Sequence, residues 1–250
     1  MPNKNNIVFH FIVLITCFWI SWVFLGFFNY SYSLWYELLD ISPFIQEMAP
    51  LNKYRPGLHL LSKDEHVQLF AEINTAIQGQ PEILSKIEYA YKRENKPDVY
   101  IPLLRGPEVQ HLEDVANLVR KLNIVGMLSL IIMAVCSVTL KSVKKYKDHM
   151  KSTLAIWVIL ASVSIVTAIT EPVELFYWLH TQVFPEGHQW FFYYQESLMT
   201  TLMKAPDLFG AIAVELLLVT AVLHISAAYF YNQAALRLST KISSNEISAE

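Results

Sequence analysis

The chain has 250 residues, of which 54% are hydrophobic and 16% are charged, and its formal net charge at pH 7 is −3. Soluble domains usually contain about 25% charged residues, so this apolar excess argues against a purely soluble protein. The net charge is small and no run mixes basic with aromatic residues, so we expect no nucleic-acid partner.

The apolar residues are gathered in four blocks. The first, residues 7–28, contains no Asp, Glu, Lys or Arg and ends at Gly26-Phe27-Phe28-Asn29, which is no small-x-small cleavage site. Helices of about 20 apolar residues at 1.5 Å per residue cross a hydrocarbon core of about 30 Å. Three further blocks lie at residues 122–140, 153–170 and 208–229. Together they predict an all-α membrane protein with four transmembrane helices, the first being a retained signal anchor.

The loop between the second and third blocks predicts the orientation. Residues 141–152 contain five lysines and one aspartate, which is typical of a cytoplasmic loop. Alternation then places both termini, including the tail 230–250, in the cytoplasm, and residues 29–121 and 171–207 outside it. We expect Asn232–Glu250 to be a disordered cytoplasmic end.

The segment 29–121 is expected to be mostly helical. Ser62, with Glu65 three residues later, has the pattern of a capping box, and Gly79 is a plausible end for the helix that follows. Gly106-Pro107 marks a second helix start. From Glu108 the helical pattern continues without a breaker into the second apolar block. The sequence therefore predicts one helix of about 33 residues, or about 50 Å, that projects about four turns beyond the membrane.

His111 lies on that projecting part. Glu108, His111 and Asp114 share a helix face because they are three residues apart. A carboxylate partner can fix the tautomer of a histidine and raise its basicity, as a general base requires. The alternative is an exposed helix residue with ordinary neighbours. His180 follows the third block, where the alternative is an interfacial polar residue among aromatic side chains.

The remaining ionisable residues give weaker predictions. His59, His66 and His188 are expected to face solvent, and His10 to be structural. Glu215, inside the fourth block, should face the bundle interior, a polar partner or a water-filled cavity, or it could instead be neutral and structural. The two cysteines lie inside predicted spans, and no G-x-S-x-G, H-E-x-x-H, GxGxxG or phosphate-loop motif occurs. We expect no metal and no cofactor.

Two stretches carry a family resemblance. HLEDVANLV, from His111, and FYWLHTQVFPEGHQWFFYYQESLMTTLMKAPDLF, from Phe176, resemble the two signatures of a bacterial integral membrane protein family that includes lipoprotein intramolecular transacylase. The resemblance implies a multi-pass protein of the bacterial cytoplasmic (inner) membrane that acts on a membrane lipid or lipoprotein. In such enzymes an acyl chain moves from the sn-2 ester of a diacylglyceryl-cysteine to the α-amino group of the same cysteine.

The resemblance also implies roles for individual residues. We expect His111 to be the base, oriented by Asp114, and His180 to be the acid or oxyanion donor, although the two roles could be exchanged. The residues expected to contact substrate are Glu108, Phe184 and Trp190. The competing hypothesis is a non-catalytic membrane assembly or envelope-sensing protein whose outer segment binds a partner. Catalysis would be favoured if His111 and His180 approach within about 8 Å around an amphipathic pocket open to lipid, because acid and base must both reach one substrate. Two histidines that point apart into solvent would favour binding. The oligomeric state is not indicated.

Overall fold

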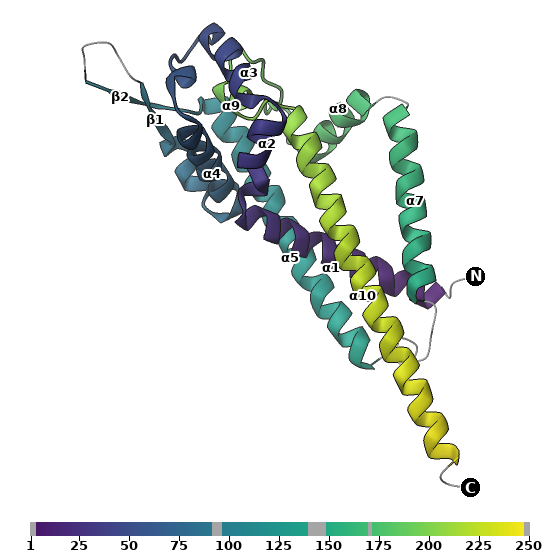
Figure 1. Cartoon of the computed structure of the whole chain (residues 1–250). Coiled ribbons are helices and arrows are strands. Elements are labelled where there is room, and N and C mark those ends of the chain that lie inside the picture. The colour runs from purple at the N-terminus through teal and green to yellow at the C-terminus, as the bar shows by residue number, and fades with distance from the viewer. Residues whose placement is uncertain (1–3, 92–96, 140–148, 170–171, 248–250) are drawn as a thin grey trace. The chain divides into compact units, whose positions relative to one another are not determined.

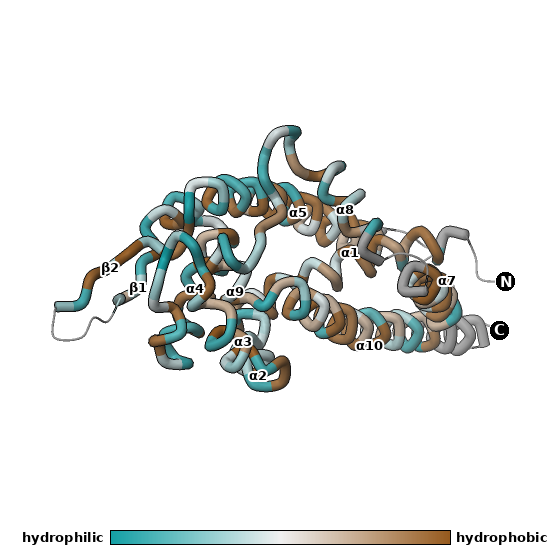
Figure 2. The backbone as a smooth tube through the Cα atoms, turned by 90° about the horizontal axis from the view of Figure 1, so that it is seen from above, coloured by the Kyte–Doolittle hydropathy of each residue, from teal (hydrophilic) through white to brown (hydrophobic). Residues whose placement is uncertain are grey.

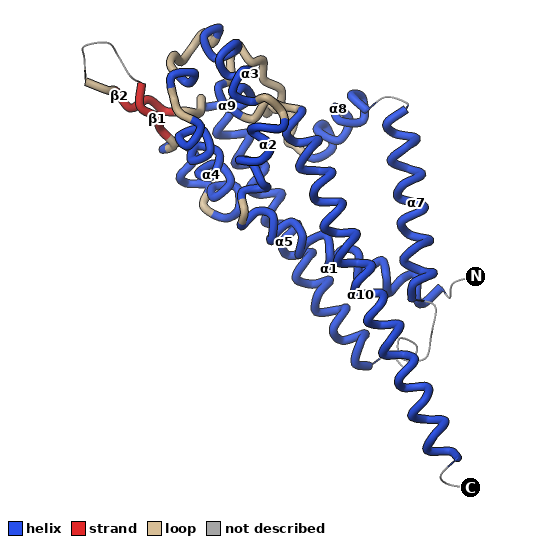
Figure 3. The backbone as a smooth tube through the Cα atoms, in the orientation of Figure 1, coloured by secondary structure: helices blue, strands red, loops and turns tan. Residues whose placement is uncertain are grey.

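The computed structural model describes residues 4–91, 97–139, 149–169 and 172–247, and most of them are helical (Figures 1 and 3). The α-helices are α1 (Lys4–Phe27), α2 (Tyr32–Leu38), α3 (Ile41–Met48), α4 (Lys63–Gly79), α5 (Gly106–Thr139), α7 (His149–Ile169), α8 (Pro172–Val183), α9 (Leu198–Leu202) and α10 (Asp207–Ile247). Short 3-10 helices are η1 (Asn29–Ser31), η2 (Ala49–Leu51), η3 (Leu58–Leu60) and η4 (Pro81–Lys86). Two strands complete the described elements, β1 (Glu88–Tyr91) and β2 (Val99–Pro102).

Four helices are long and apolar enough to cross a membrane, which confirms the number of spans predicted from the sequence. They are the segments Asn6–Phe27, Gly106–Val138, His149–Val166 and Asp207–Arg237 of α1, α5, α7 and α10. Hydrophobic residues predominate along much of α7 and α10 (Figure 2). Large apolar side chains are exposed on each of the four, for example Phe24, Ile131, Val163 and Phe230. Lipid is the environment that covers such side chains without cost.

The described residues fall into two compact units. The first unit contains Met1–Trp22, Leu122–Phe176 and Leu216–Glu250, and the second contains Val23–Lys121 and Tyr177–Glu215. The lysine-rich loop on which the predicted orientation rests lies mostly outside the described residues, at 140–148. The expected disorder of the tail is not what the structure has, because α10 continues to Ile247.

Close helix packing holds the first unit together. The indole of Trp19 on α1 lies against Gly126 on α5, where an added Cβ would stand 2.0 Å from the indole Cγ. The Trp19 Nε1–H donates to Asn123 Oδ1 at 3.0 Å, and Thr16 and Ser129 share a hydrogen bond of 2.9 Å between the same two helices. Small residues and interhelical hydrogen bonds are the usual means of helix association in a membrane.

A chain of three buried histidines also lies in the first unit. His10 Nε2 lies 2.9 Å from His149 Nδ1, and His10 Nδ1 lies 3.3 Å from His224 Nε2. The three rings come from α1, α7 and α10, and none is exposed. The structural role expected for His10 stays a prediction.

The second unit has a conventional apolar core. Tyr32 on α2 stacks on Phe70 of α4 with ring centroids 4.1 Å apart. The capping box of Ser62 and Glu65 is confirmed, and α4 ends at Gly79 as predicted. Among the described residues of this unit, the largest apolar side chains that are less than 2% exposed are Tyr32, Ile41, Ile45, Leu58, Ile73, Leu84, Leu103, Leu198, Leu202 and Leu208.

Two features of the second unit differ from expectation. Strands β1 and β2 pair as an antiparallel hairpin in which Tyr89 lies opposite Ile101, where no strand was predicted. His66, expected to face solvent, is only 1% exposed, because its ring lies between the Tyr36 hydroxyl and the Leu58 carbonyl. Tertiary packing decides both outcomes, and neither leaves a local pattern in the sequence.

Candidate active site

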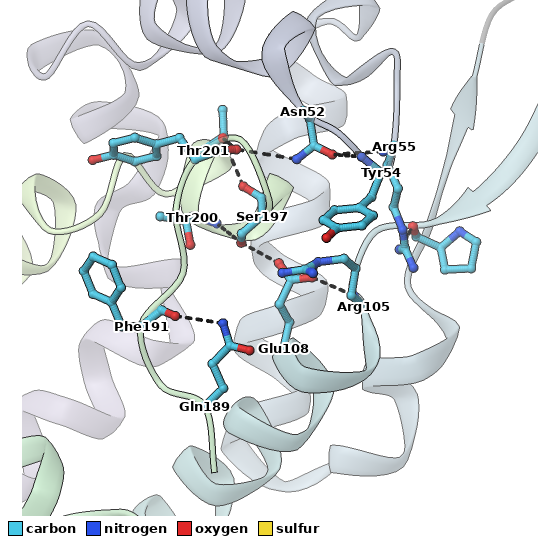
Figure 4. Close-up of polar contacts among 12 residues, drawn as sticks. Asn52, Tyr54, Arg55, Arg105, Glu108, Gln189, Phe191, Ser197, Thr200 and Thr201 are labelled. Atoms are coloured by element: carbon cyan, nitrogen blue, oxygen red, sulfur yellow. Dashed lines mark hydrogen bonds and ion pairs between the residues drawn. The ribbon is translucent and has the colours of Figure 1, made fainter. Parts of the chain in front are cut away.

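The site is built on the first turns of α5, which start as predicted at Gly106. The Arg105 backbone N–H donates to Glu108 Oε2 at 2.7 Å, and the Arg105 Nε lies 3.3 Å from the same oxygen. The other Glu108 oxygen accepts a hydrogen bond from the Ser197 hydroxyl, so that the carboxylate lies between Arg105 and Ser197 (Figure 4). Ser197 in turn caps α9 by accepting from the Thr200 N–H at 2.9 Å. Glu108 thus joins the start of α5 to the start of α9.

This arrangement corrects the role predicted for Glu108. Its side chain is 0% exposed, so it has no surface with which to contact a substrate. A buried carboxylate is stable when an opposite charge and hydrogen-bond donors surround it, and Arg105 and Ser197 provide both. Glu108 is therefore a residue that positions the helix carrying His111.

The loop from Phe184 to Ser197 is fastened to the rest of the second unit. The Lys53 N–H donates to the Gln195 carbonyl at 2.8 Å. Asn52 holds the adjoining turn, because its Oδ1 accepts from the backbone N–H groups of Tyr54 and Arg55 (Figure 4). These hydrogen bonds hold the end of the loop beside residues 52–55.

His111 packs against that aromatic loop. Its ring centroid lies 4.9 Å from that of Phe184 and 5.9 Å from that of Phe192, and the residue is half-buried. Among the hydrogen bonds of the described residues, none involves the His111 ring. Its ring contacts are therefore with aromatic side chains, while the nearby Asp114 carboxylate and His180 ring act on it electrostatically.

His180, on α8, reaches the same aromatic cluster. Its ring centroid lies 5.3 Å from that of Phe184 and 4.8 Å from that of Trp190. Phe184 consequently contacts both imidazoles, which belong to two different helices of the second unit. The structure brings together four of the residues predicted from the sequence: His111, His180, Phe184 and Trp190.

Asp114 forms its hydrogen bond with a different histidine from the one expected. Its Oδ2 lies 2.6 Å from Nδ1 of His188, and both side chains are partly buried. His188 was expected to face solvent, and Asp114 to orient His111. The His188 Nε2 lies 3.2 Å from the side-chain nitrogen of Gln110. The loop residue His188 is therefore held by two residues of α5 that flank His111.

A cavity of about 290 Å³ opens beside Asp114. It lies where α5 approaches its apolar part, and its other lining residues are Asn117, Leu118, Arg120, Lys121, Val183 and Pro185. The lining is thus partly cationic and partly apolar. The cationic part is the kind of surface that attracts an anionic headgroup, and the apolar part is the kind that an acyl chain covers.

Glu215 accepts two hydrogen bonds. Its two carboxylate oxygens accept hydrogen bonds from the Ser31 hydroxyl at 2.5 Å and from the Trp35 indole N–H at 3.1 Å. Glu215 therefore has polar partners, as the first of the two alternatives expected. In the part of the chain that the structure describes, no group of three or more His, Cys, Asp or Glu side chains is suited to a metal ion.

Four membrane-spanning helices, with two histidines at one aromatic cluster, define an integral membrane protein with a candidate site for acid–base chemistry. The chain belongs to the family of the lipoprotein intramolecular transacylase Lit, whose model matches residues 5–205. The comparison with curated proteins found no match.

Solved structures of one member of that family have the same fold. The in meso structure of the membrane integral lipoprotein intramolecular transacylase Lit from Bacillus cereus aligns with a TM-score of 0.65 at 14% identity, covering 94% of this chain and 96% of that chain. A structure of that enzyme with a histidine-to-arginine mutation gives a TM-score of 0.64 at 15% identity, covering 94% and 92%. One with a histidine-to-alanine mutation gives 0.61 at 15%, covering 95% and 93%.

Proposed function

We propose that this protein is an acyltransferase that moves an acyl chain from an ester oxygen to an amine on a membrane lipid or lipoprotein. The main observation in its support is that the Phe184 ring contacts the imidazole rings of both His111 and His180. Membership of the transacylase family supports it.

The chemistry requires two proton transfers, and two imidazoles can perform them. An ammonium is not a nucleophile, so a base must first remove one proton. The free amine then attacks the ester carbonyl, and the tetrahedral intermediate breaks its bond to the glyceryl oxygen. That oxygen accepts a proton as it leaves, and the second proton lost by the amine passes to solvent. A neutral imidazole accepts a proton on its unprotonated nitrogen and an imidazolium donates one, which suits histidine side chains to this exchange.

Transfer within one molecule lowers the demand on the enzyme. When the ester and the amine belong to the same lipoprotein, the protein mainly has to fold the substrate so that the two groups meet, since effective molarity is then high. The aromatic rings of Phe184 and Trp190 provide the surface for that folding. No serine or cysteine nucleophile is needed, which agrees with the absence of a nucleophile-elbow motif.

The membrane placement is part of the proposal. The lysines between residues 141 and 152 support a cytoplasmic loop there, with both termini in the cytoplasm. The segments 29–121 and 171–207 then lie on the extracytoplasmic side of the bacterial inner membrane. His111 and His180 consequently lie at its outer face, where lipoproteins are exposed.

The non-catalytic alternative is less well supported. An assembly or sensing protein has no need of two histidines at one aromatic cluster, and we expected them to point apart into solvent in that case. Their shared contact with Phe184 favours catalysis.

The proposal is tested in a bacterial strain that makes a diacyl lipoprotein and lacks other enzymes that acylate its amino group. Expression of the protein should move one acyl chain to the α-amino group of the N-terminal cysteine. Because transfer within one molecule leaves the total mass unchanged, tandem mass spectrometry of the lipopeptide must locate the chain. His111→Ala and His180→Ala serve as inserted, inactive controls. Unaltered lipoprotein, in cells that contain well-inserted wild-type protein, refutes the proposal.

A further inference from the structure

The cavity beside Asp114 lies where α5 changes from polar to apolar. Its volume is about 290 Å³, and its walls come from α5, from the end of α8 and from the loop that follows α8. The last cationic residues of α5, Arg120 and Lys121, line it directly before the apolar stretch that begins at Leu122. A cavity at such a border suits a molecule that has one polar and one apolar end.

The cations of this cavity have no carboxylate partner. Neither Arg120 nor Lys121 forms an ion pair with the described residues. The Arg120 Nη2–H donates to Asn117 Oδ1 at 3.0 Å, and this neutral acceptor leaves the guanidinium charge uncompensated. Asp114, the one carboxylate among the lining residues, instead lies 2.6 Å from His188 Nδ1. The two cations outnumber the single carboxylate, so the lining is complementary to an anion.

An apolar stripe continues from the cavity along α5. Leu118 lines the cavity, and Leu122 and Val125 follow it at intervals of four and three residues, which places all three on one face of the helix. The side chains of Leu122 and Val125 are exposed, as is that of Val183, which lines the cavity from α8. An acyl chain would cover this surface, whereas a small soluble anion would leave it bare.

From this combination we infer that the cavity is a binding site for one anionic glycerophospholipid. Its phosphate is bound by the Arg120 guanidinium and the Lys121 ammonium, and one of its acyl chains covers Leu118, Leu122 and Val125. This lipid is distinct from the proposed substrate. A diacylglyceryl-cysteine with a free amine has an ammonium and no phosphate at its polar end, and the two cations would repel that ammonium.

The lipid site adjoins the candidate active site. Asp114, in the cavity wall, follows His111 by one helical turn. Val183 and Pro185, which also line the cavity, flank Phe184 in the chain. The Phe184 ring contacts both candidate catalytic histidines, so a lipid bound here steadies the segment that holds this ring. Binding should therefore raise the transfer rate. That effect rests on the proposed function, whereas the binding itself does not.

Native mass spectrometry of the purified full-length protein in a neutral detergent counts the lipids that it retains. Phosphatidylglycerol and phosphatidylcholine with identical acyl chains are added in turn, so that the net charge of the headgroup is the main difference. The test variant is Arg120→Gln/Lys121→Gln. Lys53→Gln/Lys86→Gln is the matched control, because it removes two exposed cations elsewhere in the same unit. Thermal unfolding of both variants shows that the fold is kept.

We expect wild type to retain one phosphatidylglycerol at a concentration at least about tenfold below that needed for phosphatidylcholine, since each nearby Lys or Arg strengthens the binding of an anionic lipid. The control should keep this preference and the test variant should lose it. Equal retention of the two lipids by wild type, or a preference that the test variant keeps, overturns the inference. Displacement of the lipid by an equal concentration of glycerophosphoglycerol, which is the headgroup without chains, also overturns it, because the cavity would then take a soluble anion.

Activity separates this inference from the proposed function. Phosphatidylglycerol added to phosphatidylcholine vesicles should raise kcat of wild type on a diacylglyceryl-cysteine lipopeptide, with KM unchanged, and should leave kcat of the test variant unchanged. A raised KM would show that phosphatidylglycerol competes with the substrate, and it overturns a separate lipid site. An unchanged kcat overturns the activating role. Protein that retains phosphatidylglycerol as expected, yet consumes no amine in either kind of vesicle, refutes the proposed function and leaves the lipid site standing.

Discussion

The hydroxyl of Ser197, the residue that caps α9, donates a hydrogen bond to the carboxylate of Glu108, which is wholly buried near the start of α5. Two segments 89 residues apart in the sequence are joined by this bond. His111 lies one helical turn after Glu108, so this hydrogen bond also holds in place the turn of α5 that carries His111.

Ser197→Ala should destabilise the protein without removing any group from the site. The buried Glu108 carboxylate would lose one of its donors, at a cost of about 1–3 kcal/mol. Thermal unfolding in detergent measures the effect, and activity should fall as well, because α5 and the loop lose their alignment. Ser85→Ala, an exposed serine in η4, is the matched control and should change neither property. Equal unfolding temperatures for the two variants would contradict this account of the buried carboxylate.

Phe184→Ala should impair catalysis more than stability. The ring contacts both imidazoles, and its loss frees them to move by distances of the order of 1 Å, which can cost about 100-fold in rate. Steady-state kinetics with a diacylglyceryl-cysteine lipopeptide provides the measurement. Phe44→Ala removes a phenylalanine that packs on Tyr194 at 4.9 Å and serves as the control. If both substitutions lower the rate equally, Phe184 has no special role.

Gly126→Ala should loosen the packing of α1 on α5. The new Cβ would stand 2.0 Å from the Trp19 indole, so the helices or the indole must move, and such overpacking costs about 1–3 kcal/mol. Gly210→Ala is the matched helix control, because no atom lies within 4 Å of the added Cβ. That second change should be neutral or slightly stabilising, since alanine favours a helix. Unfolding temperatures in detergent that rank the two variants in the opposite order would disprove the packing argument.

The buried ring of His66 should make the stability of the second unit depend on pH. Burial lowers the pKa of His66, and this outweighs the opposing effects of the Leu58 carbonyl and the Glu65 carboxylate. The unfolded chain therefore binds a proton near pH 6.5, where the folded chain does not, so stability falls as the pH drops below about 6.5. Unfolding should be followed between pH 8 and pH 5 in wild type and in His66→Gln, where the glutamine does not titrate. Identical pH profiles for the two proteins would show that His66 makes no contribution.

Some of the structure could be predicted because its causes are local. The four spans follow from the length of each apolar block, the limits of α4 follow from Ser62, Glu65 and Gly79, and the start of α5 follows from Gly106-Pro107. Each signal lies within a few residues of the feature that it predicts. The two motifs also pointed to His111 and His180, whose rings both contact Phe184 and whose catalytic roles stay predictions.

Other features depend on contacts that no local pattern contains. Glu108, His111 and Asp114 do share one side of a helix, but helical spacing alone cannot say that Ser197 and His188 approach the two carboxylates from another segment. His188 and Asp114 are 74 residues apart. The burial of His66 likewise depends on Tyr36, which lies 30 residues away. Side chains that serve such contacts are indistinguishable in sequence from solvated ones.

The central claim is that His111 and His180 act in one ester-to-amine transfer. It is tested most directly by comparing wild type, His111→Gln, His180→Gln and the double variant on a synthetic diacylglyceryl-cysteine lipopeptide, with an amino-acetylated lipopeptide as a blank. Wild type should convert the free amine to an amide, and each single substitution should lower the rate by at least about 100-fold. The double variant should be hardly slower than the slower single one, because groups that act in one step are not additive. Single variants that retain the wild-type rate, in correctly folded protein, would contradict the claim.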